Sequence, residues 1–402
     1  MASLKDRFFY LFFLPAGHFA VDTPGGALFI IAPAIGAAWD LSPAQIGLII
    51  TAHNVGAGLG YFPSGILGDR IHRRGLVLLA MVWWAVIGYL AASFAGGYGL
   101  LLVLLMFGAI GDAGWHPTAT GTMVQKMPSR RALALGVHLT GGIFAEVIGP
   151  ITAGFLLAFL DWRSVLQISV IPAVVMGLSL LWLWPHFAHS QESRISAADV
   201  RQVFAAWLDL KGLRLFMLAV SYSMAYIALL AMTPLYLQEV HGFSSALAGM
   251  VFAAMLLAGG ATAPVLGRMS DQFGRKQVTV VAILVGSAGV LLFGFSTQVV
   301  GILIGAVASA AAFTGVRPVL LAAAVEVSGK RESTSLGLFY VLMDGIGALG
   351  ALLAGLVGSV DLRMAFVFAA GAAGVSACFA LAHGFEASRL PSSTSGKGPI
   401  PR

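Results

Sequence analysis

The chain has 402 residues, of which 58% are hydrophobic and only 10% are charged. A soluble globular protein of this length needs a surface rich in Lys, Arg, Asp and Glu, so the composition excludes one. The formal net charge of +6 is not a sign of a nucleic-acid partner, because the basic residues are confined to alternate loops. We therefore expect lipid to be the solvent of this protein.

Apolar stretches of about 20 residues recur along the whole chain, and each is long enough to cross a hydrocarbon core of about 30 Å. Backbone polar groups in lipid must be satisfied within their own segment, so each stretch is expected to be a helix. The twelve predicted transmembrane helices cover residues 8–36, 44–67, 75–95, 99–125, 132–159, 164–185, 213–237, 244–267, 277–296, 299–326, 333–358 and 363–383. The expected fold class is an all-α membrane protein.

The basic residues indicate the orientation of these helices. All lysines and arginines except Arg163, Arg317 and Arg363 lie on one side when successive loops alternate across the membrane. This asymmetry predicts that both termini are cytoplasmic, in a multi-pass protein of a bacterial inner membrane. The first stretch is expected to be a retained helix, and the single cysteine, Cys378, excludes an intramolecular disulfide or a cysteine metal cluster.

The first stretch contains two ionisable residues, each of which costs about 3 kcal/mol to insert and is therefore a functional candidate. His18 and Asp22 are four positions apart, which places both on one helix face. The Pro-Gly-Gly run at 24–26 follows immediately. It is expected to weaken or bend the helix near the middle of the membrane.

The stretch 99–125 contains the same two residue types in reverse order, with Asp112 and His116 four positions apart and Pro117 next. Two acid–histidine pairs predict a proton site, because burial and nearby charges shift the pKa of such groups. The alternative is a pair of static salt links, with His116 satisfying a backbone carbonyl freed by Pro117. Two further acids within helices, Glu146 and Asp344, are alternative proton carriers.

The remaining polar residues in apolar stretches are candidates for substrate binding. Arg317 has no acid in its own helix, so its expected partner is a substrate anion, Asp344 or an acid of the first half. Tyr222 and Tyr226 share one helix face. The last two candidates, for which packing hydrogen bonds are the alternative, are His53 and Asn54.

The chain repeats itself with a period of roughly 200 residues, which is typical of transporters built from two related bundles. The matching landmarks are Asp69 with Asp271, His116-Pro117 with Arg317-Pro318, Leu135-Gly136 with Leu336-Gly337, and the pair Asp161 and Arg163 with Asp361 and Arg363. We expect a first bundle at 1–185, a cytoplasmic linker at 186–212, a second bundle at 213–385 and a disordered cytoplasmic tail at 386–402.

Two loops of this repeat each embed an acid among basic residues, at 65–74 and 267–276. Both resemble the signature of the major facilitator superfamily, although His72 stands where that pattern usually has glycine. Residues 17–22, His116-Pro117 and 141–150 further resemble the fosmidomycin-resistance type of efflux protein. The stretch 141–150 is also similar in part to the Gly-Pro motif of proton-coupled drug antiporters.

The resemblance implies alternating access, in which the first, fourth, seventh and tenth helices line a central cavity. It also implies that the two basic loops form a cytoplasmic latch, whereas charges that only fix orientation are the alternative. The predicted gating residues are Asp69, Arg70, Arg73, Arg74, Asp271, Arg275 and Lys276.

The sequence thus favours a proton-coupled secondary transporter that exports a small amphipathic or anionic compound, as in drug-type efflux. Uptake of a small organic anion by proton symport is the alternative, because the same residues serve both directions. The expected partners are this small molecule, protons and the lipid bilayer, and the expected state is a monomer. We expect no enzyme activity, cofactor, metal or nucleic acid, since no catalytic pair, metal cluster or phosphate-binding loop is evident.

Overall fold

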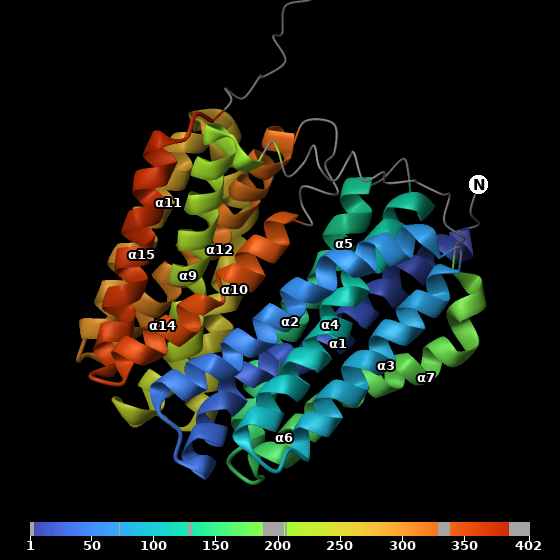
Figure 1. Cartoon of the computed structure of the whole chain (residues 1–402), viewed down its shortest axis with the longest axis horizontal. Helices are drawn as coiled ribbons and strands as arrows, with labels where there is room; N and C mark the ends of the chain where they lie inside the picture. The colour runs from blue at the N-terminus through green and yellow to red at the C-terminus, as the bar shows by residue number, and fades with distance from the viewer. Residues whose placement is uncertain are drawn as a thin grey trace, which may run out of the picture.

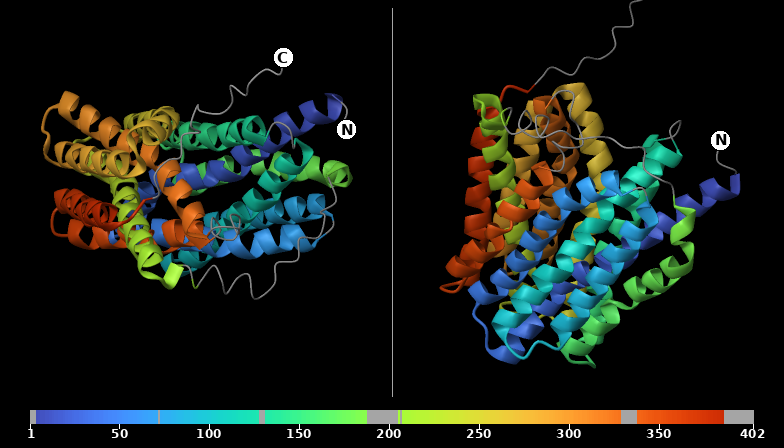
Figure 2. Two further views of the ribbon diagram at one scale, coloured as in Figure 1. Left: turned by 90° about the horizontal axis from the view of Figure 1, so that it is seen from above. Right: turned by 45° about the vertical axis from the view of Figure 1, so that its right-hand side comes forward.

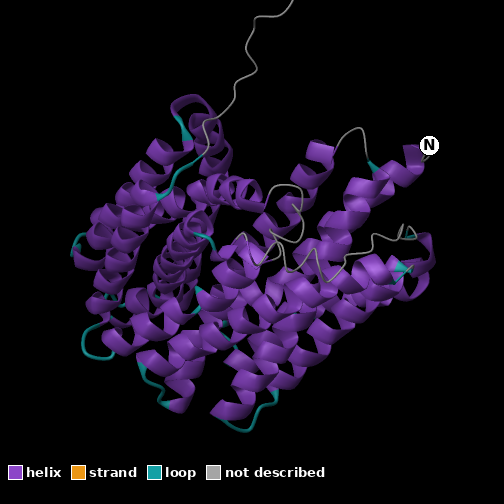
Figure 3. Cartoon of the chain, turned by 45° about the horizontal axis from the view of Figure 1, so that its top comes forward, coloured by secondary structure: helices purple, strands orange, loops and turns teal. Residues whose placement is uncertain are grey.

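The computed structural model describes residues 4–71, 73–127, 131–187, 205, 207–328 and 338–385. These ranges are almost entirely helical, and no β-strand occurs in them (Figure 3). The predicted all-α fold is confirmed. The expected tail at 386–402 and most of the expected linker at 186–212 lie outside the described residues.

The helices group into two bundles, one formed by the N-terminal half of the sequence and one by the C-terminal half (Figure 1). The first bundle contains α1 (Leu4–Trp39), α2 (Pro43–Arg70), α3 (Arg74–Ser93), α4 (Tyr98–Lys126), α5 (Arg131–Leu156), α6 (Trp162–Ser169), α7 (Ile171–Leu183) and the 3₁₀ turn η1 (Trp184–His186). The second contains α9 (Leu210–Glu239), α10 (Ser245–Phe273), α11 (Arg275–Phe295), α12 (Val299–Ser328), the π-helical turn η2 (Val341–Ile346), α14 (Leu349–Gly358) and α15 (Leu362–Ala382).

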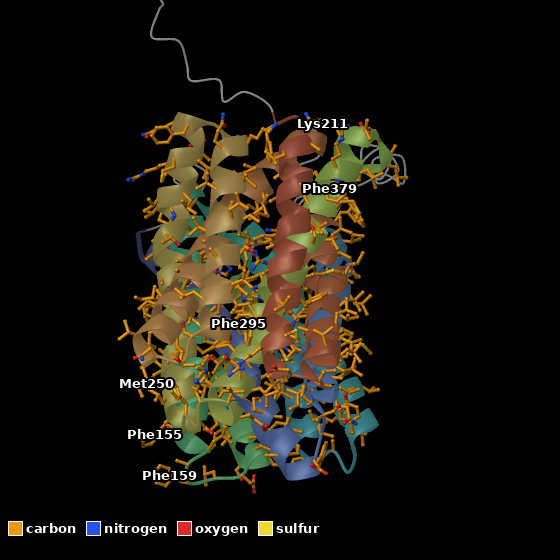
Figure 4. All side chains as sticks on the ribbon, turned by 90° about the vertical axis from the view of Figure 1, so that its left-hand side faces the viewer. Phe155, Phe159, Lys211, Met250, Phe295 and Phe379 are labelled. Atoms are coloured by element: carbon orange, nitrogen blue, oxygen red, sulfur yellow. The ribbon has the colours of Figure 1, made fainter. Side chains whose placement is uncertain are left out.

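Eleven helical spans in the described ranges are long and apolar enough to cross a membrane. α2 is long enough as well, at 28 residues, but it contains His53 and Asn54 among its apolar residues. Large apolar side chains point outward from the bundles, among them Phe155, Met250 and Phe295 (Figure 4). Such a surface suits lipid rather than water.

Two of the predicted helices differ from expectation. The stretch at 164–185 forms α6 and α7, with a break at Val170, because Pro172 has no amide hydrogen to continue the helix. In the stretch at 333–358, the described residues begin at 338 and pass through the π-helical turn η2 before α14. Such turns are frequent at functional sites, and this one contains Asp344.

The Pro-Gly-Gly run does not interrupt the first helix. α1 is helical through residues 24–26, and the Thr23 hydroxyl donates a hydrogen bond to the Phe19 carbonyl at 2.6 Å. The expected weak point therefore remains helical in this structure.

The two bundles meet through α2 with α14 and through α5 with α10. They converge at the end of the molecule opposite the N-terminus and diverge toward the other end (Figures 1 and 2). Where they converge, four glycines lie so close to the opposite bundle that a Cβ would come within 2.2–2.5 Å of a backbone atom. These contacts are Gly47 with Ala351, Gly355 with Pro43, Gly154 with Ser245, and Gly249 with Pro150.

These four crossings follow the internal repeat. Gly47 and Gly249 are roughly 200 residues apart, as are Gly154 and Gly355, so each crossing has an equivalent in the other half. Glycine lets two helix backbones approach closely, and the closest approach of the bundles therefore depends on small residues in both halves.

Another pair of repeated residues is structural. The Asp161 carboxylate accepts a hydrogen bond from the Ser164 backbone N–H at 2.8 Å and caps α6. Asp361 caps α15 in the same way, by accepting a hydrogen bond from the Arg363 backbone N–H at 2.9 Å. The repeated residues Asp161 and Asp361 are thus N-caps, each at the first turn of a helix.

Candidate functional site

The first bundle brings together the two acid–histidine pairs that the sequence analysis singled out. His18 Nε2 lies 3.1 Å from Asp22 Oδ2, and His116 Nε2 lies 3.2 Å from Asp22 Oδ1. His116 Nε2 is also 3.6 Å from Asp112 Oδ1. His116 therefore faces two carboxylates, rather than a backbone carbonyl freed by proline. We call these four residues the acid–histidine cluster.

A chain of hydrogen bonds extends this cluster toward α2 and α3. The Tyr89 hydroxyl donates to Asp112 Oδ2 at 2.9 Å, and His53 Nε2 lies 2.8 Å from the same hydroxyl. His53, predicted for substrate binding, is thus two hydrogen bonds from Asp112. Asn54 donates to the Ile50 carbonyl at 2.9 Å, which is a packing hydrogen bond within α2.

Sequence reasoning missed Tyr89, because a tyrosine in an apolar stretch gives no signal that distinguishes it from a packing residue. It is fully buried, and its hydroxyl connects two ionisable side chains. Only the fold of α2, α3 and α4 against one another places His53, Tyr89 and Asp112 in line.

Glycines make room for the cluster, which explains the local sequence. A side chain at Gly142 would collide with the His18 ring, 2.6 Å from its Nε2. One at Gly141 would strike the Pro15 carbonyl at 2.1 Å, so α5 packs directly on α1 there. At Gly25 a Cβ would be 3.2 Å from the His53 ring. The glycines of these motifs thus let helices approach around the histidines.

The second bundle carries a different charged pair. Arg317 on α12 donates to Asp344 Oδ1 at 3.2 Å, which is one of the partners expected for this arginine. The two side chains are 29% and 17% exposed, so solvent reaches both. The guanidinium also lies 5.9 Å from the centroid of the Tyr340 ring. The π-helical turn η2 positions Asp344 here.

Two tyrosines connect the charged groups of the two bundles. Tyr61 of α2 stacks on Tyr340, with ring centroids 5.4 Å apart, and the His116 ring is 5.9 Å from Tyr61. A continuous path of rings therefore runs from His116 to Arg317. Sequence reasoning did not single out either tyrosine, since nothing in the chain predicts contact between residues so far apart.

The two tyrosines predicted for substrate binding lie deep in the second bundle. Tyr222 is fully buried, and its hydroxyl donates to the Phe313 carbonyl. The Tyr226 hydroxyl accepts a hydrogen bond from Thr314 at 3.0 Å. Both hydroxyls thus hold α9 to α12, close to Arg317, and a substrate role for them stays a prediction.

Glu146 on α5 interacts electrostatically with charged residues of both bundles. They are Arg317 and Asp344 of the second bundle and Asp22 and His18 of the first. The Glu146 side chain is exposed, although Gly26 of α1 packs against its backbone. An exposed acid within reach of both groups is well placed to exchange protons or to repel an anion.

The predicted gating residues are only partly described. The side chains of Asp69 and Arg70 lie outside the described residues. Arg73 lies 5.8 Å from the Trp184 ring centroid, and Arg74 donates to Gln125 at 3.1 Å. Of the predicted gating residues in the second loop, Arg275 is half-buried, whereas Asp271 and Lys276 are exposed. Gly274 between them has φ 94°, the conformation that the signature glycine allows.

The fold and this site define a class of protein. Long apolar helices in two repeated bundles enclose ionisable groups, which are costly and rare in a membrane interior and are therefore functional candidates. Comparison with known proteins gives the family: the sequence matches the Major Facilitator Superfamily over residues 16–259 and 242–401. The chain belongs to this superfamily, and its long apolar helices are those of a multi-pass membrane protein.

Individual relatives are distant. The probable 4-methylmuconolactone transporter of Cupriavidus pinatubonensis is 29% identical over 183 residues, or 43% of this chain and 42% of that protein. The multidrug resistance protein MdtG of Klebsiella pneumoniae is 26% identical over 227 residues, 55% of this chain and 54% of that protein. The chain thus spans about half the length of the curated relatives it matches.

A solved structure shares the fold along the whole chain. An inward-facing, occupied bacterial homologue of the human lysosomal transporter Spinster superposes with a TM-score of 0.80 at 18% identity. The match covers 95% of this chain and 97% of that protein. At this identity the likeness shows the fold alone.

Proposed function

We propose that this protein couples the movement of protons to the transport of a small organic anion by alternating access. The observation that carries the proposal is the separation of two chemistries: titratable acids and histidines in the first bundle, and an arginine in the second. A proton site and an anion site that share one centre are what coupling requires.

The acid–histidine cluster is the proposed proton site. Imidazole changes charge within the physiological range of pH, and two imidazoles at ion-pair distance from two carboxylates are the proposed proton-exchanging groups. His53 and Tyr89 extend this path, and Glu146 is its proposed connection to the anion site. The alternative of static salt links predicts no effect of these residues on proton coupling.

Arg317 is the proposed anion site. Its guanidinium remains charged at any pH of the cell and offers donors in a fork that matches a carboxylate. In this structure Asp344 occupies only part of that fork. A substrate carboxylate that competes with Asp344 would release this acid, and the Tyr61 and Tyr340 rings beside it suit a substrate with an apolar body.

Two transport directions fit this chemistry. Export in exchange for protons is our first choice, supported by the resemblance to fosmidomycin-resistance proteins and by the similarity to MdtG. Uptake by proton symport is the second, supported by the similarity to a probable 4-methylmuconolactone transporter. The bundle contacts at Gly47, Gly154, Gly249 and Gly355 are the proposed closed side in this state.

The experiment begins with a search for the substrate. Purified protein is screened against small carboxylates by thermal shift, since a ligand that binds the folded state raises Tm. The best ligand is then tested in proteoliposomes with an imposed pH gradient. Gradient-dependent flux supports the proposal, and its sign relative to the gradient separates export from uptake. Flux that is the same with and without the gradient contradicts proton coupling.

A further inference from the structure

A third histidine lies against the acid–histidine cluster, in a chain for which the sequence analysis expected no metal. The ring of His138 on α5 is 4.5 Å from that of His18, measured between centroids, and the His116 ring is 4.6 Å from His18. One ring nitrogen of each of the three histidines lies within 4.8 Å of the others. The three imidazoles therefore lie together, and the Asp22 carboxylate contacts two of them, His18 and His116.

His138 has donor and acceptor groups that nothing else uses. Its side chain is 2% exposed, and neither Nδ1 nor Nε2 has a hydrogen-bond partner among the described residues. Asp22 Oδ1 is likewise buried without a hydrogen bond of good geometry, although His116 is near. Native proteins rarely leave buried polar atoms unpartnered, so these atoms point to a missing ligand.

The hydrogen bond on the far side of His18 indicates what kind of ligand is missing. His18 Nδ1 lies 3.0 Å from the His138 carbonyl oxygen, an acceptor only, so Nδ1 carries a hydrogen and donates. In the neutral ring the lone pair is then on Nε2, which faces Asp22 Oδ2 at 3.1 Å. Two lone pairs at this distance repel unless a positive centre lies between them. That centre is a proton or a metal ion.

We propose that His18, His116, His138 and Asp22 bind a divalent transition-metal ion of the zinc type. Imidazole nitrogen with one carboxylate is a donor set for zinc, cobalt or nickel and not for magnesium or calcium. A histidine that binds such an ion typically donates its other ring N–H to a carbonyl or carboxylate, as His18 does.

The distances suit a tetrahedral ion. Bonds of about 2.1 Å place neighbouring ligand atoms about 3.4 Å apart. The Asp22 oxygens lie 3.1 Å and 3.2 Å from the ring nitrogens of His18 and His116. A ring nitrogen of His138 lies within 4.8 Å of a ring nitrogen of each of the other two histidines, so His138 is the proposed fourth ligand. Because the ion would occupy the position of the coupled proton, bound metal is expected to stop transport, and this second part rests on the proposed function.

The first experiment measures binding directly and does not depend on transport. Full-length protein without a polyhistidine tag is dialysed against ZnCl₂, and metal content is measured per chain. We expect one ion per chain and an affinity at least about tenfold weaker in His138→Ala, since even residues that only orient a metal ligand contribute that much. His241→Ala, which removes a histidine from the α9–α10 loop, is the matched control and should bind normally. Equal affinity in His138→Ala contradicts the proposal.

A spectroscopic arm uses the unmodified chain, in case the variant does not fold. CoCl₂ replaces ZnCl₂, and tetrahedral cobalt absorbs visible light far more strongly than octahedral cobalt. An intense visible spectrum that zinc abolishes supports the four-ligand site. No binding, or only the weak octahedral spectrum, overturns it.

The inhibition arm compares flux with and without zinc in proteoliposomes, for the unmodified chain, His138→Ala and His241→Ala. We expect zinc to inhibit the unmodified chain and His241→Ala, and to lose at least about tenfold in potency against His138→Ala. Zinc binding without inhibition would refute the competition with protons and leave the metal site standing. Absent binding would refute the site and leave the proposed function untouched.

Discussion

The two bundles are alike in their contacts and unlike in their chemistry. Equivalent glycines form the crossings, and equivalent aspartates cap α6 and α15. At one pair of equivalent positions, however, the first bundle has His116 and the second has Arg317. An imidazole can gain and lose a proton, whereas a guanidinium stays charged. The repeat thus preserves the glycine crossings and the helix caps, whereas the ionisable residues at these equivalent positions differ between the halves.

The largest expected effect follows from removing the shared acid of the first bundle. Asp22→Asn takes away the carboxylate that both His18 and His116 face, so we expect accumulation driven by a pH gradient to fall to the level of empty vesicles. Asp40→Asn, at an exposed residue after α1, is the matched control and should transport normally. Undiminished gradient-driven accumulation in Asp22→Asn would remove this residue from the proton site.

The corresponding test in the second bundle replaces Arg317 by histidine, the residue type found at the equivalent position, 116, of the first bundle. Arg317→His keeps a ring nitrogen donor but loses the permanent charge and the fork, so KM for the anion should rise roughly 10- to 100-fold at neutral pH, or about 1.4–2.8 kcal/mol. Initial-rate measurements in proteoliposomes give this value, with Arg363→Ala, at an exposed position at the start of α15, as the control. An unchanged KM would show that the anion binds elsewhere.

The glycine crossings should behave alike in both halves. Gly47→Leu and Gly249→Leu each place a side chain against the opposite backbone, and overpacking of about 1–3 kcal/mol would shift the closed state by about 5- to 150-fold. We therefore expect a cysteine introduced between the bundles to be labelled faster, in both variants, by a reagent added from the side where the bundles converge. Gly371→Leu on α15, where a Cβ meets nothing within 4 Å, is the control. A large increase in labelling in only one of the two variants would contradict the equivalence of the two crossings.

A smaller effect is expected from the hydrogen-bond chain. Tyr89→Phe removes the hydroxyl between His53 and Asp112, and a hydrogen bond worth about 1 kcal/mol corresponds to about a fivefold loss of gradient-driven flux. Tyr236→Phe removes a buried tyrosine hydrogen bond to Gly294 in the other bundle. Both variants should lose similar thermal stability, and only Tyr89→Phe should lose coupling. Equal flux in the two would make Tyr89 a packing residue.

The smallest effects concern the helix caps. The Ser164 backbone N–H holds the pKa of Asp161 below its usual range, so this carboxylate stabilises the fold at neutral pH and stops doing so as pH falls below about 4. Asp161→Ala and Asp361→Ala should each lower Tm slightly at pH 7, by similar amounts. Below pH 4 the difference for Asp161→Ala should vanish. A loss of Tm that persists in acid would show that the cap acts through packing.

The sequence was sufficient for the fold class, because hydrophobic spans and a repeated pair of loops follow from composition and periodicity. It also paired His18 with Asp22 and Asp112 with His116, since residues four apart share a helix face. It did not reveal that both pairs meet on Asp22, or that Tyr89, Tyr61 and Tyr340 join the network. Those contacts depend on how separate helices cross, and crossing geometry leaves no local pattern in the chain.

The same limit explains His138 and Asp344. Nothing near His138 in sequence signals a second histidine across a helix interface, and a π-helical turn at Asp344 has no simple sequence signature. Arg317 was left with three possible partners, and the structure brings it to Asp344 at 3.2 Å. Roles in transport require measurement.

The central claim is that protons are handled in the first bundle and the anion in the second, and counterflow tests it most directly. Vesicles loaded with unlabelled substrate exchange it for labelled substrate without net proton movement. Asp22→Asn should retain this exchange while losing accumulation driven by a pH gradient, and Arg317→Ala should lose both. Normal exchange in Arg317→Ala, or normal gradient-driven accumulation in Asp22→Asn, would contradict the division of labour between the bundles.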